Sequence, residues 1–117
     1  MTRAPMQVLA LPFVVDDAGT VTYAVLHRSD VHAWQGVAGG AEDGETPAEA
    51  ARRECAEELG TDAFNLIELA SVSSIPAVNF IEWSTWRERS PSLLVVPEHT
   101  FGVRLRNRRR PIVRRTP

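Results

Sequence analysis

The chain has 117 residues, enough to enclose one compact core but too few for two domains. Apolar residues make up 44% and charged residues 24%, an average composition for a soluble globular protein that excludes a disordered or fibrous chain. The formal net charge is -2, and arginine provides all of the fixed positive charge because the chain has no lysine. No apolar run approaches the roughly 20 residues that a helix needs to cross a bilayer, so we expect a cytoplasmic protein with no membrane partner.

The first predicted elements are two strands near the N-terminus. Residues 6–15 and 21–27 are mostly aliphatic or aromatic, and they flank the polar segment 16–20, which contains Gly19. A polar turn with glycine between two such stretches is typical of a β-hairpin. We therefore predict that these two segments pair with each other.

A third short strand is predicted at residues 34–38, directly before Gly39 and Gly40. We expect the two glycines to form a turn that leads into a loop through Glu45. Because glycine has no side chain, such a turn lets the backbone come close to a metal ion or to phosphate groups. Gly39 and Gly40 are therefore predicted to contribute to a binding site.

The best-defined element is a helix from Pro47 to Leu59. Thr46 can cap its first turn, and Glu49, three residues later, completes a capping box. Proline is favourable at the first helical position, where the missing N–H would have no partner within the helix. Gly60 supplies the left-handed residue that commonly ends a helix.

This helix is predicted to have two different faces. At about 100° per residue, four residues form a narrow apolar stripe: Ala48, Ala51, Cys55 and Leu59. Three acidic residues share an adjacent arc about 100° wide: Glu54, Glu57 and Glu58. Cys55 is the only cysteine and falls on the apolar stripe, so we interpret it as a small core residue rather than a nucleophile.

Two further strands are predicted after the helix, at residues 64–74 and 92–105, the second interrupted at Pro97–Glu98. Residues 76–91 between them contain aromatic side chains without a clear period, and we expect an irregular or partly helical insertion. Strands on both sides of one strong helix predict an α+β fold with a mixed sheet.

The C-terminal residues differ sharply in charge from the rest of the chain. Residues 1–103 hold all 15 acidic groups and six arginines, giving -9, whereas residues 104–117 hold seven arginines and no acid, giving +7. We therefore predict one domain over residues 1–103 and an arginine-rich tail over residues 104–117. A truncated or altered C-terminus explains this tail better than nucleic-acid binding does, although clustered arginine also binds phosphate strongly.

The three glutamates of the helix repel each other, and a hard divalent cation is one way to compensate their charge. Mg²⁺ prefers oxygen ligands, usually one or two carboxylates together with water and substrate phosphates. The alternative is a solvated acidic face, which is the common outcome for a helix rich in glutamate. The residues around the helix decide between these two interpretations.

The spacing of these residues is more informative than their number. From Gly39 the chain runs through five residues to Glu45 and through seven more to the segment RECAEELGT at 53–61. This pattern resembles the signature of the Nudix hydrolase family and matches it at all seven fixed positions. Cys55 and Thr61 occupy two positions that bulky aliphatic residues usually fill. The resemblance favours a metal-binding helix over a solvated acidic face.

The resemblance implies a Nudix-like α/β/α sandwich whose catalytic motif is a loop, a helix and a second loop, here without the usual C-terminal strand and helix. It implies hydrolysis of a nucleoside diphosphate linked to another group, with Mg²⁺ or Mn²⁺ as the cofactor. A homodimer is a further expectation, because a sheet that lacks a covering layer leaves apolar surface to bury.

The resemblance also assigns roles within the motif. In this family the last two glutamates bind metal, which gives that role to Glu57 and Glu58. Glu54 becomes a third metal ligand or the general base. Gly39 would offer its carbonyl oxygen to the metal.

Four further residues complete the predicted site. Glu45 and Arg53 would form an ion pair that braces the loop of the catalytic motif against the helix. Glu98 follows Pro97 at a predicted strand start and is a candidate to assist the metal or the attacking water, with a solvated edge residue as the alternative. The general base is therefore open between Glu54 and Glu98. Trp34 is a candidate to stack on a nucleobase, because a flat ring suits a flat base, and a position in the core is the alternative.

The segments Trp34–Gly60 and Val96–His99 are similar to the branch of the family that acts on dATP-like substrates or on dihydroneopterin triphosphate. We therefore expect conversion of a ribo- or deoxyribonucleoside triphosphate to a monophosphate and pyrophosphate. There are two alternatives. One is hydrolysis of a dinucleoside polyphosphate or a nucleotide sugar, and the other is nucleotide binding without catalysis.

Overall fold

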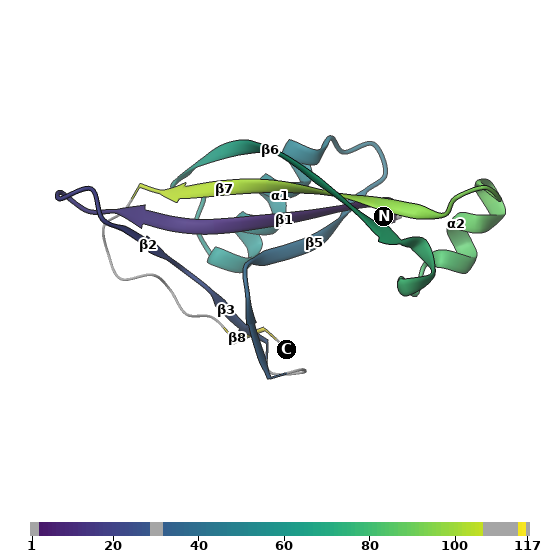
Figure 1. Cartoon of the computed structure of the whole chain (residues 1–117), viewed down its shortest axis with the longest axis horizontal. Coiled ribbons are helices and arrows are strands. Elements are labelled where there is room, and N and C mark those ends of the chain that lie inside the picture. The colour runs from purple at the N-terminus through teal and green to yellow at the C-terminus, as the bar shows by residue number, and fades with distance from the viewer. Residues whose placement is uncertain (1–2, 29–31, 107–114, 117) are drawn as a thin grey trace.

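A five-stranded mixed sheet forms the centre of the structure, a computed structural model that describes residues 3–28, 32–106 and 115–116 (Figure 1). Its strands are β1 (Arg3–Val15), β2 (Val21–Tyr23), β5 (Val37–Glu42), β6 (Phe64–Pro76) and β7 (Val95–Leu105). They follow the order β2-β1-β7-β6, and β5 also pairs with β1. β1 and β7 are parallel and the other pairs are antiparallel, which confirms the predicted α+β fold with a mixed sheet.

A second, three-stranded sheet consists of β3 (Leu26–Arg28), β4 (Ala33–Gln35) and β8 (Arg115–Thr116), in the order β4-β3-β8. Its presence makes the predicted N-terminal hairpin only partly correct. β2 pairs with the end of β1, but the chain leaves the central sheet after Tyr23, where Ala24 turns inward and is buried. β3 then pairs with β4 instead of β1.

Gly39 and Gly40 do not form the predicted turn but lie inside β5, in antiparallel register with β1. Their lack of a side chain has a different consequence there. A Cβ atom at Gly39 would collide with the Glu54 carboxylate, and one at Gly40 would collide with the Arg3 guanidinium. The two glycines therefore allow two charged side chains to lie directly against the strand.

Helix α1 (Pro47–Leu59) has the predicted bounds and both predicted caps. The Thr46 hydroxyl accepts a hydrogen bond from the Glu49 N–H, and the Glu49 carboxylate accepts one from the Thr46 N–H. Gly60 follows in the left-handed conformation, with φ of 69°. These local contacts fix where the helix starts and ends, and therefore which of its side chains face the sheet.

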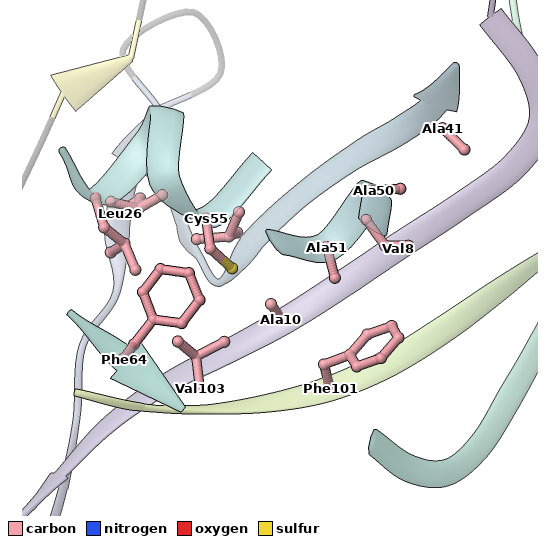
Figure 2. Packing of buried hydrophobic residues seen from close by; sticks show 12 residues of the cluster. Val8, Ala10, Leu26, Ala41, Ala50, Ala51, Cys55, Phe64, Phe101 and Val103 are labelled. Atoms are coloured by element: carbon pink, nitrogen blue, oxygen red, sulfur yellow. The ribbon is translucent and has the colours of Figure 1, made fainter. Parts of the chain in front are cut away.

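The main core lies between α1 and the central sheet (Figure 2). Cys55 is fully buried there, as predicted, and burial raises the pKa of its thiol to about 12, so the thiol stays protonated at neutral pH. Ala51 and Leu59 of the predicted apolar stripe are buried as well. The predicted place of Ala48 in this stripe is wrong. Its angle around the helix points toward the stripe, but Ala48 lies in the first turn and is exposed, whereas Ala50 is buried.

The segment between β6 and β7 is partly helical, as predicted. We call residues 77–89 the α2 segment; it contains a 3₁₀ turn (Ala77–Asn79) and helix α2 (Trp83–Arg89), and lies at one end of the central sheet (Figure 1). Trp86 packs with Ala77 and Val96 in a small second core, which attaches the segment to β7. Neither α2 nor any other helix in the described ranges is long and apolar enough to cross a membrane.

The predicted interruption of the last strand at Pro97–Glu98 is wrong, because β7 runs through both residues. β7 pairs with β6 at Pro97, whereas its pairing with β1 begins one residue later, so the proline falls just outside the stretch paired on both sides. β7 also continues through Arg104 and Leu105, the first two residues of the predicted tail. Most of the remaining tail, on which the interpretation of an altered C-terminus rests, lies outside the described residues.

Candidate active site

A cavity of about 710 Å³ opens beside the two glycines of β5. Three carboxylates line it, from Glu54 and Glu58 of α1 and from Glu98 of β7. The backbone of Gly39 and Gly40 belongs to the same wall. A cavity of this size suits a nucleotide-sized ligand, since small-molecule sites usually measure about 300–1,000 Å³.

The register of the central sheet brings Glu98 to the cavity. Gln7 of β1 and Glu98 are partners in the parallel pair, so their side chains emerge on the same face, and both line the cavity. Val8 and Ala10, the neighbours of opposite orientation along β1, are buried in the core beneath α1. The cavity therefore lies on the sheet face away from this core, and Glu54 of α1 reaches it past the glycines of β5.

Glu54 combines burial with a close fit against β5. Its side chain is 14% exposed, and its carboxylate fills the space that a side chain at Gly39 would occupy. Burial raises the pKa of this carboxyl above its ordinary value, and the hydrogen bond from Arg53 opposes the rise. A carboxylate of raised pKa is a stronger base than an exposed one, which suits proton transfer.

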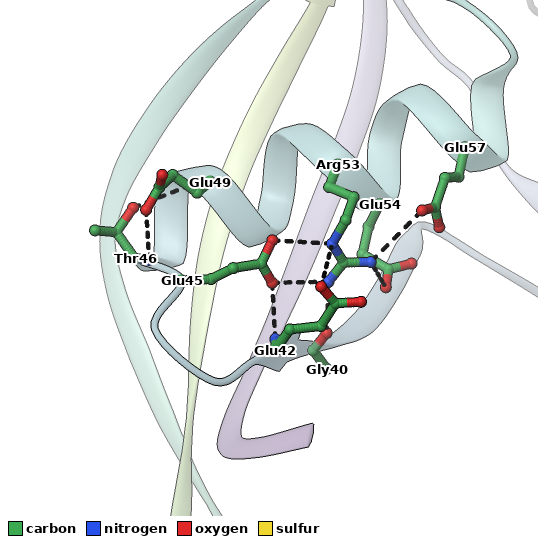
Figure 3. Close-up of polar contacts among 8 residues, drawn as sticks. All are labelled: Gly40, Glu42, Glu45, Thr46, Glu49, Arg53, Glu54 and Glu57. Atoms are coloured by element: carbon green, nitrogen blue, oxygen red, sulfur yellow. Dashed lines mark hydrogen bonds and ion pairs between the residues drawn. The ribbon is translucent and has the colours of Figure 1, made fainter. Parts of the chain in front are cut away.

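Arg53 braces the loop before α1 against the helix (Figure 3). Its Nε and Nη2 donate to the two carboxylate oxygens of Glu45, each at 2.9 Å, so the predicted ion pair between these residues is present. Nη2 also donates to the Gly40 carbonyl oxygen at 3.0 Å, and Nη1 donates to Glu54 Oε1 at 3.0 Å. The hydrogen bond from Arg53 lowers the pKa of the Glu45 carboxyl. One guanidinium thus fixes the loop, the strand and a cavity carboxylate relative to one another.

Two of the three glutamates of α1 line the cavity, and the metal-binding role of Glu57 and Glu58 stays a prediction. Glu54 and Glu58 line the cavity, whereas the side chain of Glu57 is 62% exposed and its Oε1 lies 3.7 Å from Arg53 Nη1. At about 100° per residue, Glu57 projects roughly 60° further from the apolar stripe than Glu54 does, which explains its exposure. Within residues 3–28, 32–106 and 115–116, no group of three or more His, Cys, Asp or Glu side chains is arranged to hold a metal ion.

Trp34 is not among the residues that line the cavity. It is the partner of His27 in the β3–β4 pair, and the centroids of the two rings are 4.7 Å apart. The next residue, Gln35, does line the cavity, and because side chains alternate along a strand, Trp34 emerges on the opposite face. Trp34 is 57% exposed on that face, so its stacking on a nucleobase stays a prediction.

The sequence-based prediction missed three polar residues of the cavity: Arg3, Gln7 and Gln35. Strand alternation could have identified Gln7, which precedes a residue with a core position, Val8. Arg3 carries no such signal. The register of β1 against β5 shifts between Arg3 and Gln7, and a partner of Arg3, Glu82, comes from the distant α2 segment.

Comparison with known proteins connects these features to one family. The NUDIX domain family matches residues 6–110 of the chain. The crystal structure of a NUDIX protein from Listeria monocytogenes has 38% sequence identity and a TM-score of 0.70. That match covers 86% of this chain and 64% of the Listeria protein, so the chain spans slightly less than two thirds of its length.

Two further structures are similar over most of this chain. The E. coli dihydroneopterin triphosphate pyrophosphohydrolase has 26% identity and a TM-score of 0.67, over 97% of this chain and 76% of that protein. A C. elegans Ap4A hydrolase has 16% identity and a TM-score of 0.60, over 97% of this chain and 75% of that protein, which shows a likeness of fold alone. No curated protein sequence matches the chain.

Proposed function

The chain belongs to the Nudix family, and from this membership we propose that it is a hydrolase, dependent on Mg²⁺ or Mn²⁺, that cleaves a phosphoanhydride bond in a substrate containing a nucleoside diphosphate. In its most specific form, the proposed reaction converts a nucleoside triphosphate to a monophosphate and pyrophosphate. Water attacks one phosphorus and forms the new P–O bond. The bridging oxygen between the α- and β-phosphorus leaves with one of the two products, and a base takes the proton of the water.

The observation that carries this proposal is the shared cavity of Glu54, Glu58 and Glu98 beside the backbone of Gly39. Carboxylate and carbonyl oxygens are the donors that hard divalent cations prefer. Without such a cation, the carboxylates would repel a polyphosphate. The chemistry of the donor set therefore fits Mg²⁺ or Mn²⁺, and Glu57 remains a predicted ligand on the family resemblance.

Each part of the cavity has a proposed task in the reaction. A bound divalent cation supplies charge neutralisation at the phosphates and lowers the pKa of water. Glu58, Glu98 and the Gly39 carbonyl oxygen would hold it. Glu54 would accept the proton, because burial raises the pKa of its carboxyl and therefore its basicity. Arg53 donates to Glu54 Oε1, which holds the carboxylate in place and leaves Oε2 to take the proton.

A nucleoside triphosphate is the substrate class that we favour. The likeness to the E. coli dihydroneopterin triphosphate pyrophosphohydrolase extends over nearly all of the chain and includes sequence as well as fold. The likeness to the C. elegans Ap4A hydrolase is one of fold, so it gives weaker support to a dinucleoside polyphosphate.

A metal-supplemented substrate screen tests the proposal. The purified chain is incubated with nucleoside triphosphates, dinucleoside polyphosphates and nucleotide sugars, in Mg²⁺, Mn²⁺ or EDTA, and the products are separated by anion-exchange chromatography. We expect a monophosphate and pyrophosphate from a triphosphate in the presence of metal, and no turnover in EDTA. Binding of nucleotides without turnover across the whole panel would favour a non-catalytic binding module.

Matched glutamine variants test the site itself. Glu54→Gln removes the proposed base, and we expect kcat to fall by about 100- to 10,000-fold. Glu88→Gln makes the same chemical change at an exposed position on α2, and kcat should stay within about twofold of the wild-type value. A Glu54→Gln variant that turns over at the wild-type rate would remove the catalytic assignment.

A further inference from the structure

The cavity has one positively charged side chain among the described residues that line it, that of Arg3. Three carboxylates share the same lining, from Glu54, Glu58 and Glu98. A polyphosphate that enters brings several negative charges, and like charges at short range repel each other. A fixed cation in this lining would therefore contribute directly to substrate affinity.

Arg53 is close to the cavity but is already occupied. Its guanidinium makes four hydrogen bonds, to Glu45, Glu54 and the Gly40 carbonyl oxygen. Binding a phosphate would require it to give up contacts that fix the loop before α1. Arg3 is the better candidate for a phosphate ligand in the described part of the chain.

The Arg3 guanidinium is held in place from several directions. Its Nη1 donates to Glu82 Oε1 at 3.1 Å, and its Nη2 donates to Gln7 Oε1 at 2.8 Å. Its central carbon lies 5.5 Å from the centroid of the Phe80 ring. On another side it lies against Gly40, where any side chain would collide with it. Because these contacts fix the plane of the guanidinium, little side-chain entropy remains to be lost on binding.

This anchored guanidinium keeps N–H groups for a ligand. A guanidinium has five N–H donors, and Glu82 and Gln7 accept one each. Nη1 and Nη2 therefore each retain a second N–H, and Arg3, whose side chain is 34% exposed, is one of the residues that line the cavity. Two neighbouring N–H groups in one plane match the oxygens of a phosphate group.

The α2 segment holds the backbone of Arg3 as well as its side chain. The Trp86 indole Nε1 donates to the Arg3 carbonyl oxygen at 2.8 Å. Trp86 is 4% exposed, in the small core that joins the α2 segment to β7. The segment thus fixes the start of β1 through Trp86 and the guanidinium through Glu82.

We propose that Arg3 binds a non-bridging phosphate oxygen of the substrate in this cavity, and that the α2 segment positions Arg3 for that contact. The inference rests on the proposed function, because it takes a polyphosphate as the ligand. Arg3 is a binding residue in this scheme. Glu82 and Trp86 are positioning residues that act through it.

Calorimetric titration with inorganic tripolyphosphate in Mg²⁺ tests the inference without depending on turnover. We compare the wild type with Arg3→Gln, with Arg3→Lys, and with Arg89→Gln, an exposed arginine that lies outside the cavity. We expect Kd to rise about 10- to 100-fold for Arg3→Gln, since a charge-assisted hydrogen bond is lost. Arg3→Lys should recover part of this loss, because it restores the charge but not the planar pair of donors. Arg89→Gln should change Kd less than about twofold.

The salt dependence of binding separates a phosphate contact from a structural role. Raising the ionic strength should weaken binding to the wild type more steeply than binding to Arg3→Gln, because screening acts on the charge that the variant lacks. Thermal unfolding of each variant shows whether it is folded at the temperature of the titration. Arg3→Lys keeps the test valid if Arg3→Gln proves unstable.

The outcomes of the titration and the substrate screen are distinguishable. Kd unchanged within twofold in Arg3→Gln, or no binding of tripolyphosphate to the wild type at millimolar concentration, would overturn the inference. Turnover lost in Glu54→Gln with an unchanged Kd in Arg3→Gln would leave the proposed function intact and reject Arg3. If Arg3→Gln binds tripolyphosphate more weakly than the wild type does, but the wild type hydrolyses no nucleotide, the result would support the role of Arg3 and reject the proposed hydrolase activity.

Discussion

Helices α1 and α2 both support the same cavity, but they are stabilised in different ways. α1 has 13 residues, a capping box at its start and a left-handed glycine after its end. α2 has seven residues and no side-chain hydrogen bond at its N-cap, Glu82. It is held by Trp86, which is buried against β7 and bonded to β1. α1 is therefore defined largely by its own residues, whereas α2 depends on what it packs against.

The charges that the two helices bring to the cavity follow this difference. α1 carries the acidic side chains Glu54 and Glu58 directly, in a helix whose position is well fixed. The α2 segment acts on a positive charge that belongs to another element, Arg3 of β1. Variants that weaken one helix should therefore affect catalysis and substrate binding differently. Four predictions test this contrast between the helices, two of them through kinetics and two through stability.

Of these four predictions, Arg53→Gln should have the largest effect, because it removes the brace of α1. Glu45 and Glu54 would lose their strongest donor in partly buried positions, and we expect the free energy of unfolding to fall by about 2 kcal/mol. kcat should also fall, by about 10- to 100-fold, as Glu54 loses its orientation. Urea denaturation and steady-state kinetics measure the two effects.

Arg52→Gln is the matched control for this variant. Arg52 is the neighbouring arginine on α1, it is exposed, and its guanidinium lies 5.5 Å from the centroid of the Phe64 ring. Loss of that contact should cost less than about 1 kcal/mol and leave kcat unchanged. Equal effects of the two variants would show that Arg53 contributes through surface charge rather than as a brace.

Trp86→Phe should weaken the support that the α2 segment gives to Arg3. It removes the N–H that bonds the Arg3 carbonyl oxygen and leaves a small space in the second core. We expect a loss of about 1.5 kcal/mol in the free energy of unfolding. In kinetics, KM should rise while kcat changes little, because Arg3 is proposed to bind phosphate rather than to take part in the chemical step.

Trp83→Phe provides the comparison within the same core. Trp83 packs against that core at its edge, with Arg87 stacked 4.8 Å from its ring centroid. Its replacement should leave KM near the wild-type value. If Trp83→Phe raised KM as much as Trp86→Phe does, the hydrogen bond to Arg3 would not be the cause.

The same contrast between the helices explains what the sequence could predict. The caps and the stripe of α1 are local patterns, so the bounds of the helix and the burial of Cys55 were predicted correctly from them, whereas the pair of Glu45 and Arg53 was predicted from the resemblance to the Nudix signature. Gly39 and Gly40 were expected in a turn, because a pair of glycines is more common in turns than in strands. Here they lie in a strand against which other side chains pack closely. Their contacts become visible only when α1 and β1 are placed beside them.

The parts that could not be predicted depend on long-range pairing. Arg3 meets Glu82 across 79 residues of sequence, and no local pattern indicates this contact. The angle of Glu57 around α1 is local information, but the place of Glu54 and Glu58 in the cavity depends on where β5 and β7 lie beside the helix. Trp34 faces away from the cavity because β3 pairs with β4, whereas the sequence suggested that residues 21–27 would pair with the first strand.

Thr46→Ala tests the local stability of α1 directly. Loss of the capping hydrogen bond between the Thr46 hydroxyl and the Glu49 N–H should lower the free energy of unfolding by about 1 kcal/mol. Thr85→Ala, at an exposed position inside α2, should change it by less than about 0.5 kcal/mol. Urea denaturation of both variants gives the comparison, and an equal loss would contradict the assignment of local stability to α1.

The smallest expected effects concern Glu54 of α1 and Glu45 of the loop before it, whose carboxyl pKa values shift in opposite directions. Burial raises the pKa of Glu54, so its contribution to stability is present below its unfolded pKa and is lost as pH rises through the folded value. The hydrogen bond from Arg53 lowers the pKa of Glu45, so its contribution is present above its unfolded pKa and is lost as pH falls through the folded value.

The two glutamine variants should therefore shift the melting temperature in opposite directions in EDTA. At about pH 8, Glu54→Gln should melt above the wild type and Glu45→Gln below it, and both differences should shrink as the pH approaches about 4. Thermal unfolding over this pH range measures both. A melting temperature below the wild-type value for both variants would mean that Glu54 is stabilised by Arg53 more than it is destabilised by burial. A higher stability of Glu54→Gln would identify Glu54 as a carboxylate whose position is unfavourable for the fold alone, as the proposed role of a buried base requires.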